Sequence, residues 1–101
     1  MLNFLQKYVK MILSENNKGE NMHYIYIVQC CDGTLYTGYT NNLEKRIKAH
    51  NENKGAKYTR GRNPVELKYF EEYQCKGDAL KREAQIKKLT RPKKQLLFHN
   101  I

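Results

Sequence analysis

Alternation of apolar and polar side chains predicts the first ordered element of this chain. From His23 to Cys30, aromatic and aliphatic residues follow one another and β-forming types dominate, which is typical of a strand. Asp32-Gly33 is a strong turn signal, and the stretch from Thr34 to Tyr39 again favours an extended backbone. The pattern therefore predicts a β-hairpin.

After the hairpin, the apolar positions adopt the spacing of a helix. Asn41 stands at the expected N-cap, with Glu44 three residues later as the second half of a capping box. The helix is expected to run to about Asn53, with Leu43 and Ile47 as its buried stripe.

The remaining chain predicts one more strand and two more helices. Residues 54–64 form a basic loop, and Val65 to Tyr73 alternates well enough for a third strand. Gly77-Asp78 begins a second helix that runs to about Leu89, and Pro92 lies in the first turn of a short C-terminal helix. We expect an α/β fold in which helices flank a small three-stranded, mostly antiparallel sheet.

The hairpin register decides whether two tyrosines share a face. A strict two-residue turn at Asp32-Gly33 would place Tyr26 and Tyr36 on opposite faces, because side chains alternate along a strand. A three-residue loop or a bulge would place both phenols on the same face. A shared site needs the second arrangement, so we predict an odd-numbered loop or a bulge.

Residues 1–21 differ in character from the rest. Helical spacing of apolar residues predicts a short amphipathic helix from Asn3 to Ser14, followed by a polar, linker-like stretch. Lys18-Gly19-Glu20 can be encoded by a purine-rich stretch like a ribosome-binding site, just upstream of Met22. We therefore expect an N-terminal extension over 1–21, arising from a mis-called start, and a single domain over 22–101.

Charge and cysteine content narrow the class of partner. The chain has 101 residues and a net charge of +9, from 19 Lys and Arg against 10 Asp and Glu, which favours a polyanion, most often nucleic acid. Three cysteines without a CxxC pair suit free thiols in a reducing cytoplasm. No apolar run is long enough to cross a membrane.

An acid on the second predicted helix is the most informative single position. On a helical wheel, Ala79, Leu80 and Ile86 surround Glu83, so its carboxylate falls within the buried face. A buried carboxylate is costly unless it is paired or holds a metal. The alternative to a metal or catalytic role is a salt bridge, to Arg46 or Lys87.

Several short motifs occur in a fixed order. Tyr24-Ile25-Tyr26 and Tyr36-Thr37-Gly38 precede the first helix, Arg46 and His50 follow on it, and Glu83 stands shortly before Ile86-Lys87. Over roughly residues 22–90, this set resembles the GIY-YIG nuclease domain, and its small stand-alone bacterial branch in particular. The resemblance implies cleavage of nucleic-acid phosphodiesters with a tyrosine, an arginine, a glutamate and one divalent metal ion.

The resemblance also assigns expected roles on the hairpin and the second helix. Tyr36 would activate water or attack the phosphate itself, and Tyr26 would orient Tyr36 or the phosphate. Gly38 would allow a close backbone approach. Glu83 would hold a single Mg²⁺ or Mn²⁺.

The first helix would supply the contacts to phosphate. The planar guanidinium of Arg46 suits a phosphate whose charge grows in the transition state. His50 would accept a hydrogen bond from a phenol or contact phosphate, and an ordinary surface histidine is the alternative.

Cations and an aromatic residue alternate in the basic loop. Phosphate contacts and base stacking need this mixture, whereas the alternative is a solvated loop. The residues expected to bind nucleic acid are Lys57, Tyr58, Arg60 and Arg62 in the loop, together with Lys87 on the second helix.

The chain departs from the family pattern at some positions. Tyr24 replaces the first glycine, Thr37 replaces the second isoleucine, and Tyr39 stands where some members have a lysine. A nucleic-acid-binding module that cuts little or nothing therefore remains the alternative to an endonuclease. A basic RNA- or ribosome-associated protein is a third possibility. DNA is favoured over RNA, and we expect a cytoplasmic bacterial protein that is a monomer or a weak homodimer.

Overall fold

A three-stranded antiparallel sheet forms the centre of the structure, which is a computed structural model that describes residues 22–99. The expected N-terminal extension and its helix lie outside the described residues. The elements in chain order are β1 (His23–Gln29), β2 (Leu35–Thr40), α2 (Leu43–Asn51), the 3₁₀ turn η1 (Lys57–Thr59), β3 (Glu66–Tyr73), α3 (Lys76–Lys87) and α4 (Arg91–His99). The expected α/β fold is confirmed.

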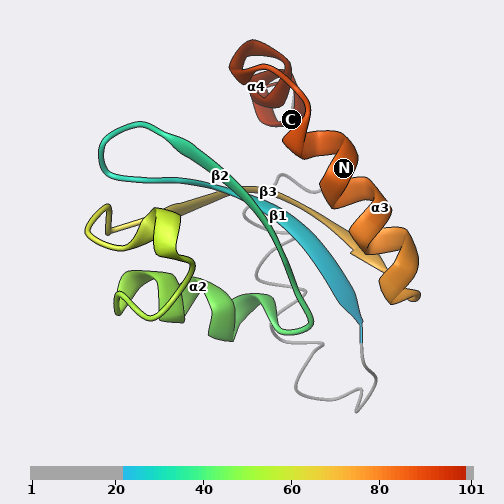
Figure 1. Ribbon diagram of the computed structural model, residues 1–101, viewed down its shortest axis with the longest axis horizontal. Helices are drawn as coiled ribbons and strands as arrows, with labels where there is room; N and C mark the ends of the chain where they lie inside the picture. Colours follow the sequence, from blue (N-terminus) through green and yellow to red (C-terminus); the bar gives the residue numbers. More distant parts are fainter. Residues whose placement is uncertain (1–21, 100–101) are drawn as a thin grey trace.

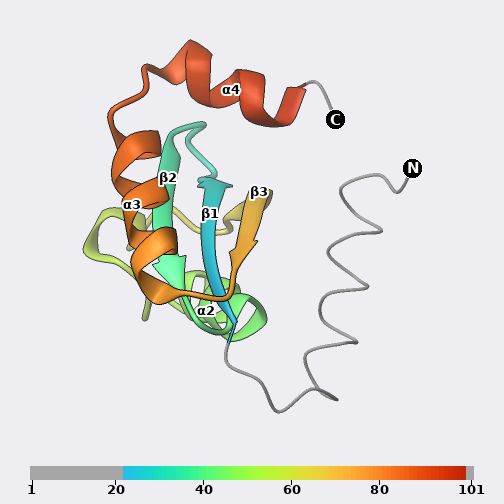
Figure 2. The same cartoon turned by 90° about the vertical axis from the view of Figure 1, so that its right-hand side faces the viewer.

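The strand order is β2-β1-β3, so β1 is central and β2 is an edge strand. Figure 1 shows α2 on one side of the sheet and α3 on the other. Alternate residues of β1 face these two layers. Tyr24, Tyr26 and Val28 pack towards α2 with Leu43, whereas Ile25 and Ile27 pack towards α3. Figure 2 shows α4 lying across one end of the sheet.

The hairpin has the register that a shared site requires. Tyr26 pairs with Gly38 and Val28 pairs with Tyr36, while the Cys30 amide donates to the Thr34 carbonyl. Three residues, 31–33, therefore form the loop, with Gly33 at a φ of 86°. Tyr36 lies on the face of Tyr26, and the prediction of an odd-numbered loop is confirmed.

Two local predictions are wrong. The N-cap of α2 is Asn42, not Asn41, because the Asn42 side chain accepts a hydrogen bond from the Lys45 amide at 3.0 Å. Leu80 does not belong to the buried face of α3, since 40% of it is exposed. Ala79 and Ile86 on the same helix are fully buried.

Candidate active site

The Tyr26 side chain lies against the edge strand β2 at a glycine, where there is no side chain to block it. Its partner on β2 is Gly38, and a Cβ built there would lie 2.5 Å from the Tyr26 hydroxyl and 2.9 Å from the Tyr36 ring. Any side chain at this position would displace one of the two phenols. The absence of a side chain at Gly38 therefore lets both rings lie against the backbone of β2.

A buried chain of hydrogen bonds links this phenol to α2 and η1. The Tyr26 hydroxyl lies 2.8 Å from Nε2 of His50 and accepts a bond of 3.2 Å from Nε of Arg46. On the other side of the imidazole, Nδ1 of His50 lies 2.7 Å from the Thr59 hydroxyl, which donates to the Ala56 carbonyl at 3.0 Å.

One assignment of donors and acceptors satisfies every hydrogen bond in this series. Because the Thr59 hydroxyl donates its hydrogen bond to the Ala56 carbonyl, it accepts a hydrogen bond from Nδ1–H of His50. Nε2 of His50 is then the acceptor of a hydrogen bond from the Tyr26 hydroxyl. The phenol oxygen can in turn accept a hydrogen bond from Arg46. The arrangement holds a neutral imidazole in one tautomer and orients the phenol.

The pKa values agree with that assignment. Burial, with a further contribution from the Arg46 charge, lowers the pKa of His50 to about 4, so the imidazole is neutral near pH 7. Burial raises the pKa of Tyr26 to about 12 against the opposing effect of Arg46. The Tyr26 phenol is thus a poor proton acceptor and is suited to orienting its neighbours.

Tyr36 occupies the half-buried position beside this chain. Its ring centroid lies 5.6 Å from that of His50 and 6.3 Å from that of Tyr26. Burial alone would lower the pKa of Arg46, but the oxygens of Tyr26 and Tyr36 outweigh it and raise the pKa. The guanidinium therefore interacts with both phenols.

Tyr58 covers the outer side of Tyr36. The two rings stack with centroids 5.7 Å apart and planes inclined by 24°, and 44% of Tyr58 is exposed. The Arg62 guanidinium lies 4.7 Å from the Tyr58 ring centroid and forms an ion pair of 2.6 Å with Asp32 in the hairpin loop. The basic loop is thereby fastened to the hairpin, with an aromatic side chain at the edge of the site.

Glu83 approaches from the other layer. Its side chain is 18% exposed, and its carboxylate acts on Tyr26 through space by helping to raise the phenol pKa. It also forms an ion pair of 3.6 Å with Lys87, one of the two partners considered for a salt bridge. The acid is therefore close enough for its charge to act on Tyr26, and it is not turned fully to solvent.

The donor set at Glu83 suits a hard divalent cation only in part. Among the described residues, no group of three or more His, Cys, Asp or Glu side chains could enclose a metal. Mg²⁺ commonly binds through one or two carboxylates and completes its shell with water and substrate phosphate. A single half-buried carboxylate is compatible with that mode, in which the nucleic acid itself supplies ligands.

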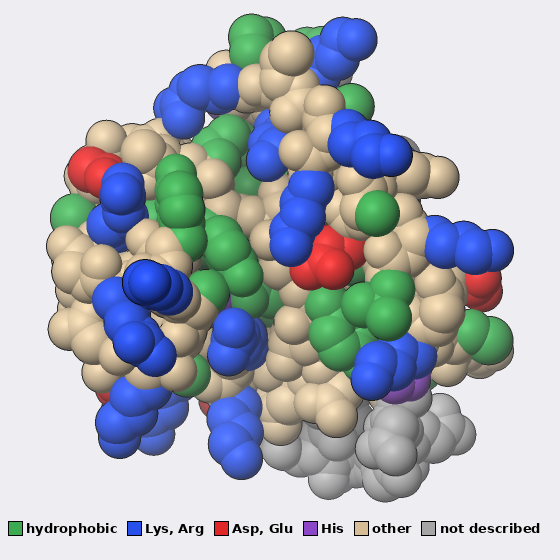
Figure 3. Space-filling view, in the orientation of Figure 1, with side chains coloured by type: hydrophobic (Ala, Val, Ile, Leu, Met, Phe, Trp, Pro, Cys, Tyr) green, Lys and Arg blue, Asp and Glu red, His purple; other side chains and the backbone are tan. Residues whose placement is uncertain are grey.

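The remaining predicted binding residues lie on the surface. Lys57 and Arg60 flank Tyr58 and are exposed, and neither contacts the phenol–imidazole chain. Figure 3 shows Lys and Arg side chains on both sides of a hollow in one face of the molecule, whereas acidic side chains are few there. None of the helices within residues 22–99 is long and apolar enough to cross a bilayer.

Sequence reasoning did not identify the residues that support the site. Thr59 orients His50, and Gly55 packs so closely on the same ring that a Cβ there would collide with Nδ1. A single threonine or glycine in a polar loop carries no periodic signal. Only the folded loop reveals their contact with the imidazole.

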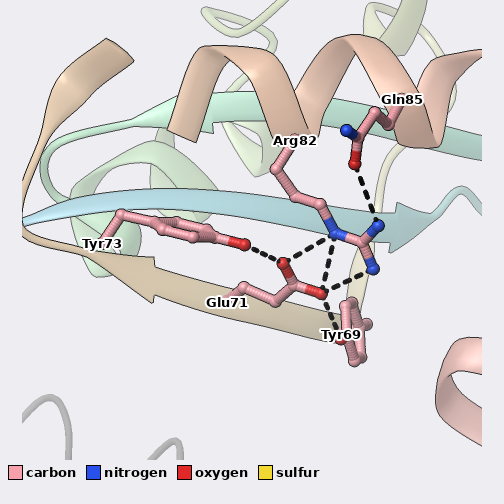
Figure 4. A network of polar contacts seen from close by, with 5 residues as sticks. All are labelled: Tyr69, Glu71, Tyr73, Arg82 and Gln85. Atoms are coloured by element: carbon pink, nitrogen blue, oxygen red, sulfur yellow. Dashed lines mark hydrogen bonds and ion pairs between the residues drawn. The ribbon is translucent and has the colours of Figure 1, made fainter. Parts of the chain in front are cut away.

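A polar cluster between β3 and α3 was also missed (Figure 4). The Glu71 carboxylate accepts hydrogen bonds of 2.5 Å from both Tyr69 and Tyr73 and is held by the Arg82 guanidinium, whose Nε lies 2.9 Å from Oε1. Burial opposes ionisation, but these donors prevail and lower the pKa of Glu71. Because Arg82 precedes Glu83, this cluster fixes α3 on the sheet beside the site.

Comparison with known proteins gives a family-level match. The GIY-YIG catalytic domain matches residues 22–95. A UPF0213 protein of Clostridium perfringens is 64% identical over 77 residues, which cover 76% of this chain and 83% of that protein. A UPF0213 protein of Halobacterium salinarum is 49% identical over 77 residues, which cover 76% of this chain and 100% of that protein.

Two solved structures are similar to this chain. The solution NMR structure of the UPF0213 protein of Bacillus halodurans has a TM-score of 0.50 and 47% identity, covering 75% of this chain and 81% of that chain. The solution NMR structure of a protein of E. faecalis has a TM-score of 0.55 and 42% identity, covering 81% and 91% of the two chains.

Proposed function

This chain belongs to the GIY-YIG catalytic domain family, and from that premise we propose that it is a divalent-metal-dependent endonuclease that hydrolyses phosphodiester bonds. DNA is the favoured substrate, in repair or processing. The observation that supports the proposal is the cluster in which Arg46 interacts with both Tyr26 and Tyr36, while the Glu83 charge acts on Tyr26 from the other layer.

Arg46 and Tyr36 carry the chemistry at the phosphate. The guanidinium binds the non-bridging oxygens, where negative charge grows as water attacks phosphorus. Tyr36 stands beside it and takes the proton from the attacking water. The Arg46 guanidinium interacts with the Tyr36 oxygen, so it offsets negative charge on that oxygen during the proton transfer.

The other members of the site hold these two groups in place. His50 accepts a hydrogen bond from the Tyr26 hydroxyl and keeps the phenol oxygen directed at Arg46, which limits the positions that the guanidinium can take. Glu83 would hold a Mg²⁺ or Mn²⁺ ion, which would supply positive charge to stabilise the transition state. Lys87, now paired with Glu83, would be available to contact nucleic acid.

Plasmid nicking tests the proposal. Purified protein is incubated with supercoiled plasmid and with branched DNA, with and without Mn²⁺, beside Tyr36→Phe and Glu83→Ala. We expect metal-dependent nicking by the unmodified chain and its loss in both variants. Tyr39→Phe is the matched control, because that phenol contacts His23 instead of the site, and it should nick normally. Equal nicking by all proteins would indicate a contaminating nuclease and refute the proposal.

The ion pair of Glu83 with Lys87 favours a second candidate, a nucleic-acid-binding module of the same fold that does not cut. In that case Glu83 is a structural acid, and the +9 charge supplies the affinity. Tight, salt-sensitive binding without nicking of DNA or RNA at any Mn²⁺ concentration would select this candidate. The net charge and three free cysteines support a cytoplasmic location in either case.

A further inference from the structure

A small cavity lies where the hairpin, the basic loop and the two C-terminal helices meet. Its volume is about 210 Å³, which is below the roughly 300–1,000 Å³ usual for drug-sized ligands. It is lined by Thr34, Leu35, Tyr58, Leu89, Arg91 and Lys94. None of these residues except Tyr58 belongs to the site described above.

The lining combines an apolar part with a cationic part. Leu35, Leu89 and the aromatic ring of Tyr58 provide apolar and aromatic surface, and Arg91 and Lys94 bring two positive charges to the same space. Within residues 22–99, no carboxylate lies within ion-pair distance of either cation. Burial and the nearby Lys87 lower the pKa of Lys94, so an anion bound here would relieve an existing repulsion.

Two lining residues connect the cavity with the candidate active site, Tyr58 by a ring contact and Lys94 by a charge effect. Tyr58 stacks on Tyr36 at 5.7 Å, and Lys94 is close enough to Lys87 to respond to its charge, while Lys87 is the ion-pair partner of Glu83. A group held in the cavity therefore lies beside the ring that stacks on Tyr36 and beside a lysine that senses the charge of Lys87.

We propose that this cavity is a subsite for one unpaired nucleotide, with its base among Leu35, Leu89 and Tyr58 and its phosphate on Arg91 and Lys94. The proposal rests on the endonuclease function and adds a substrate feature to it. A base within a duplex is covered by its stacking neighbours, and the cavity has room for a single ring system, so the nucleotide must be extruded or already unpaired.

Binding of a mononucleotide tests the subsite without any cleavage. ¹⁵N-labelled protein is titrated with thymidine 5′-monophosphate, thymidine or inorganic phosphate while amide signals are followed by NMR. Thymidine 5′-monophosphate should shift the amide signals of Leu35 and Leu89. It should also bind at least about fivefold more tightly than thymidine or inorganic phosphate alone. Unshifted Leu35 and Leu89, or equal affinity for inorganic phosphate, would overturn the proposal.

Variants distinguish binding in this cavity from a general attraction to the positive charge of the protein. The double variant Arg91→Gln with Lys94→Gln should bind thymidine 5′-monophosphate about fivefold or more weakly. Lys93 is an exposed cation of the same helix that does not line the cavity, so Lys93→Gln should change this affinity little. Equal weakening by both proteins would show that only net charge matters and would refute the subsite.

A cleavage experiment places the subsite relative to the cut. In oligonucleotides with one abasic position, loss of the base that enters the cavity should raise KM about tenfold at one position beside the cut, with little change in kcat. Arg91→Gln with Lys94→Gln should abolish that dependence on position. Mononucleotide binding without cleavage would refute the endonuclease function alone, and cleavage without any positional dependence would refute the subsite alone.

Discussion

Protonation of His50 should destabilise this protein in mild acid. The imidazole is fully buried, donates through Nδ1 to Thr59 and accepts at Nε2 from Tyr26. A second proton on the ring would remove the acceptor and place a charge near Arg46. Burial and that charge lower the pKa of His50 from 6.5 to about 4.

The magnitude follows from this difference. Because the unfolded chain binds the proton with a pKa near 6.5, it takes up more protons than the folded chain between pH 6.5 and about 4. The contribution of His50 is fully present above pH 6.5 and is lost as pH falls towards 4. One pKa unit corresponds to about 1.4 kcal/mol, so the full loss is on the order of 3 kcal/mol, of which about 2 kcal/mol falls between pH 7 and pH 5.

Urea unfolding followed by far-ultraviolet circular dichroism measures this dependence. The free energy of unfolding is compared at about pH 7 and about pH 5 for the unmodified chain, His50→Gln and His99→Gln. We expect His50→Gln to be less stable at pH 7 and to lose much of the pH dependence, whereas His99→Gln, at an exposed site on α4, should retain it. Parallel pH profiles for all three proteins would refute the assignment of His50 as a buried neutral imidazole.

Three further substitutions test the packing around the site by urea unfolding. Gly38→Ala should destabilise by roughly 1–3 kcal/mol because its Cβ would collide with both phenols, whereas Gly77→Ala, with open space at its Cβ, should be neutral or stabilise by up to about 1 kcal/mol. Equal effects of the two would contradict the close approach. Thr37→Val should stabilise by about 1 kcal/mol, because the Thr37 hydroxyl is buried and has no hydrogen-bond partner among residues 22–99. A loss of stability would mean that this hydroxyl is satisfied. Glu71→Gln should cost about 1–2 kcal/mol near pH 7, and because the pKa of Glu71 is lowered, the difference should shrink as pH falls through the acidic range. A difference independent of pH would argue against an ionised Glu71.

The hairpin and the first helix could be predicted because their signals are local. The turn at Asp32-Gly33 and the need for both phenols on one face together specify a three-residue loop, which the register confirms. The spacing of Arg46 and His50 placed them on one side of α2, and both contact Tyr26.

The parts that could not be predicted depend on contacts distant in sequence. The pairing of Glu71 with Arg82 joins a strand to a helix, and charged residues at such positions look like ordinary solvated surface in a single sequence. The exposure of Leu80 could not be predicted for a similar reason: a helical wheel does not show how much of the helix surface the sheet covers. Neither the cavity nor the contact of Thr59 with His50 carries a periodic pattern.

A double-mutant cycle on Tyr36 and Glu83 tests most directly whether groups from the two layers act on one phosphate. Single-turnover cleavage rates are measured for the unmodified chain, Tyr36→Phe, Glu83→Gln and the double variant at saturating DNA and Mn²⁺. Cooperation at one phosphate predicts a loss of about 10²-fold or more in each single variant and little further loss in the double variant. Single losses that multiply in the double variant, or a Tyr36→Phe rate equal to that of the unmodified chain, would contradict a shared site.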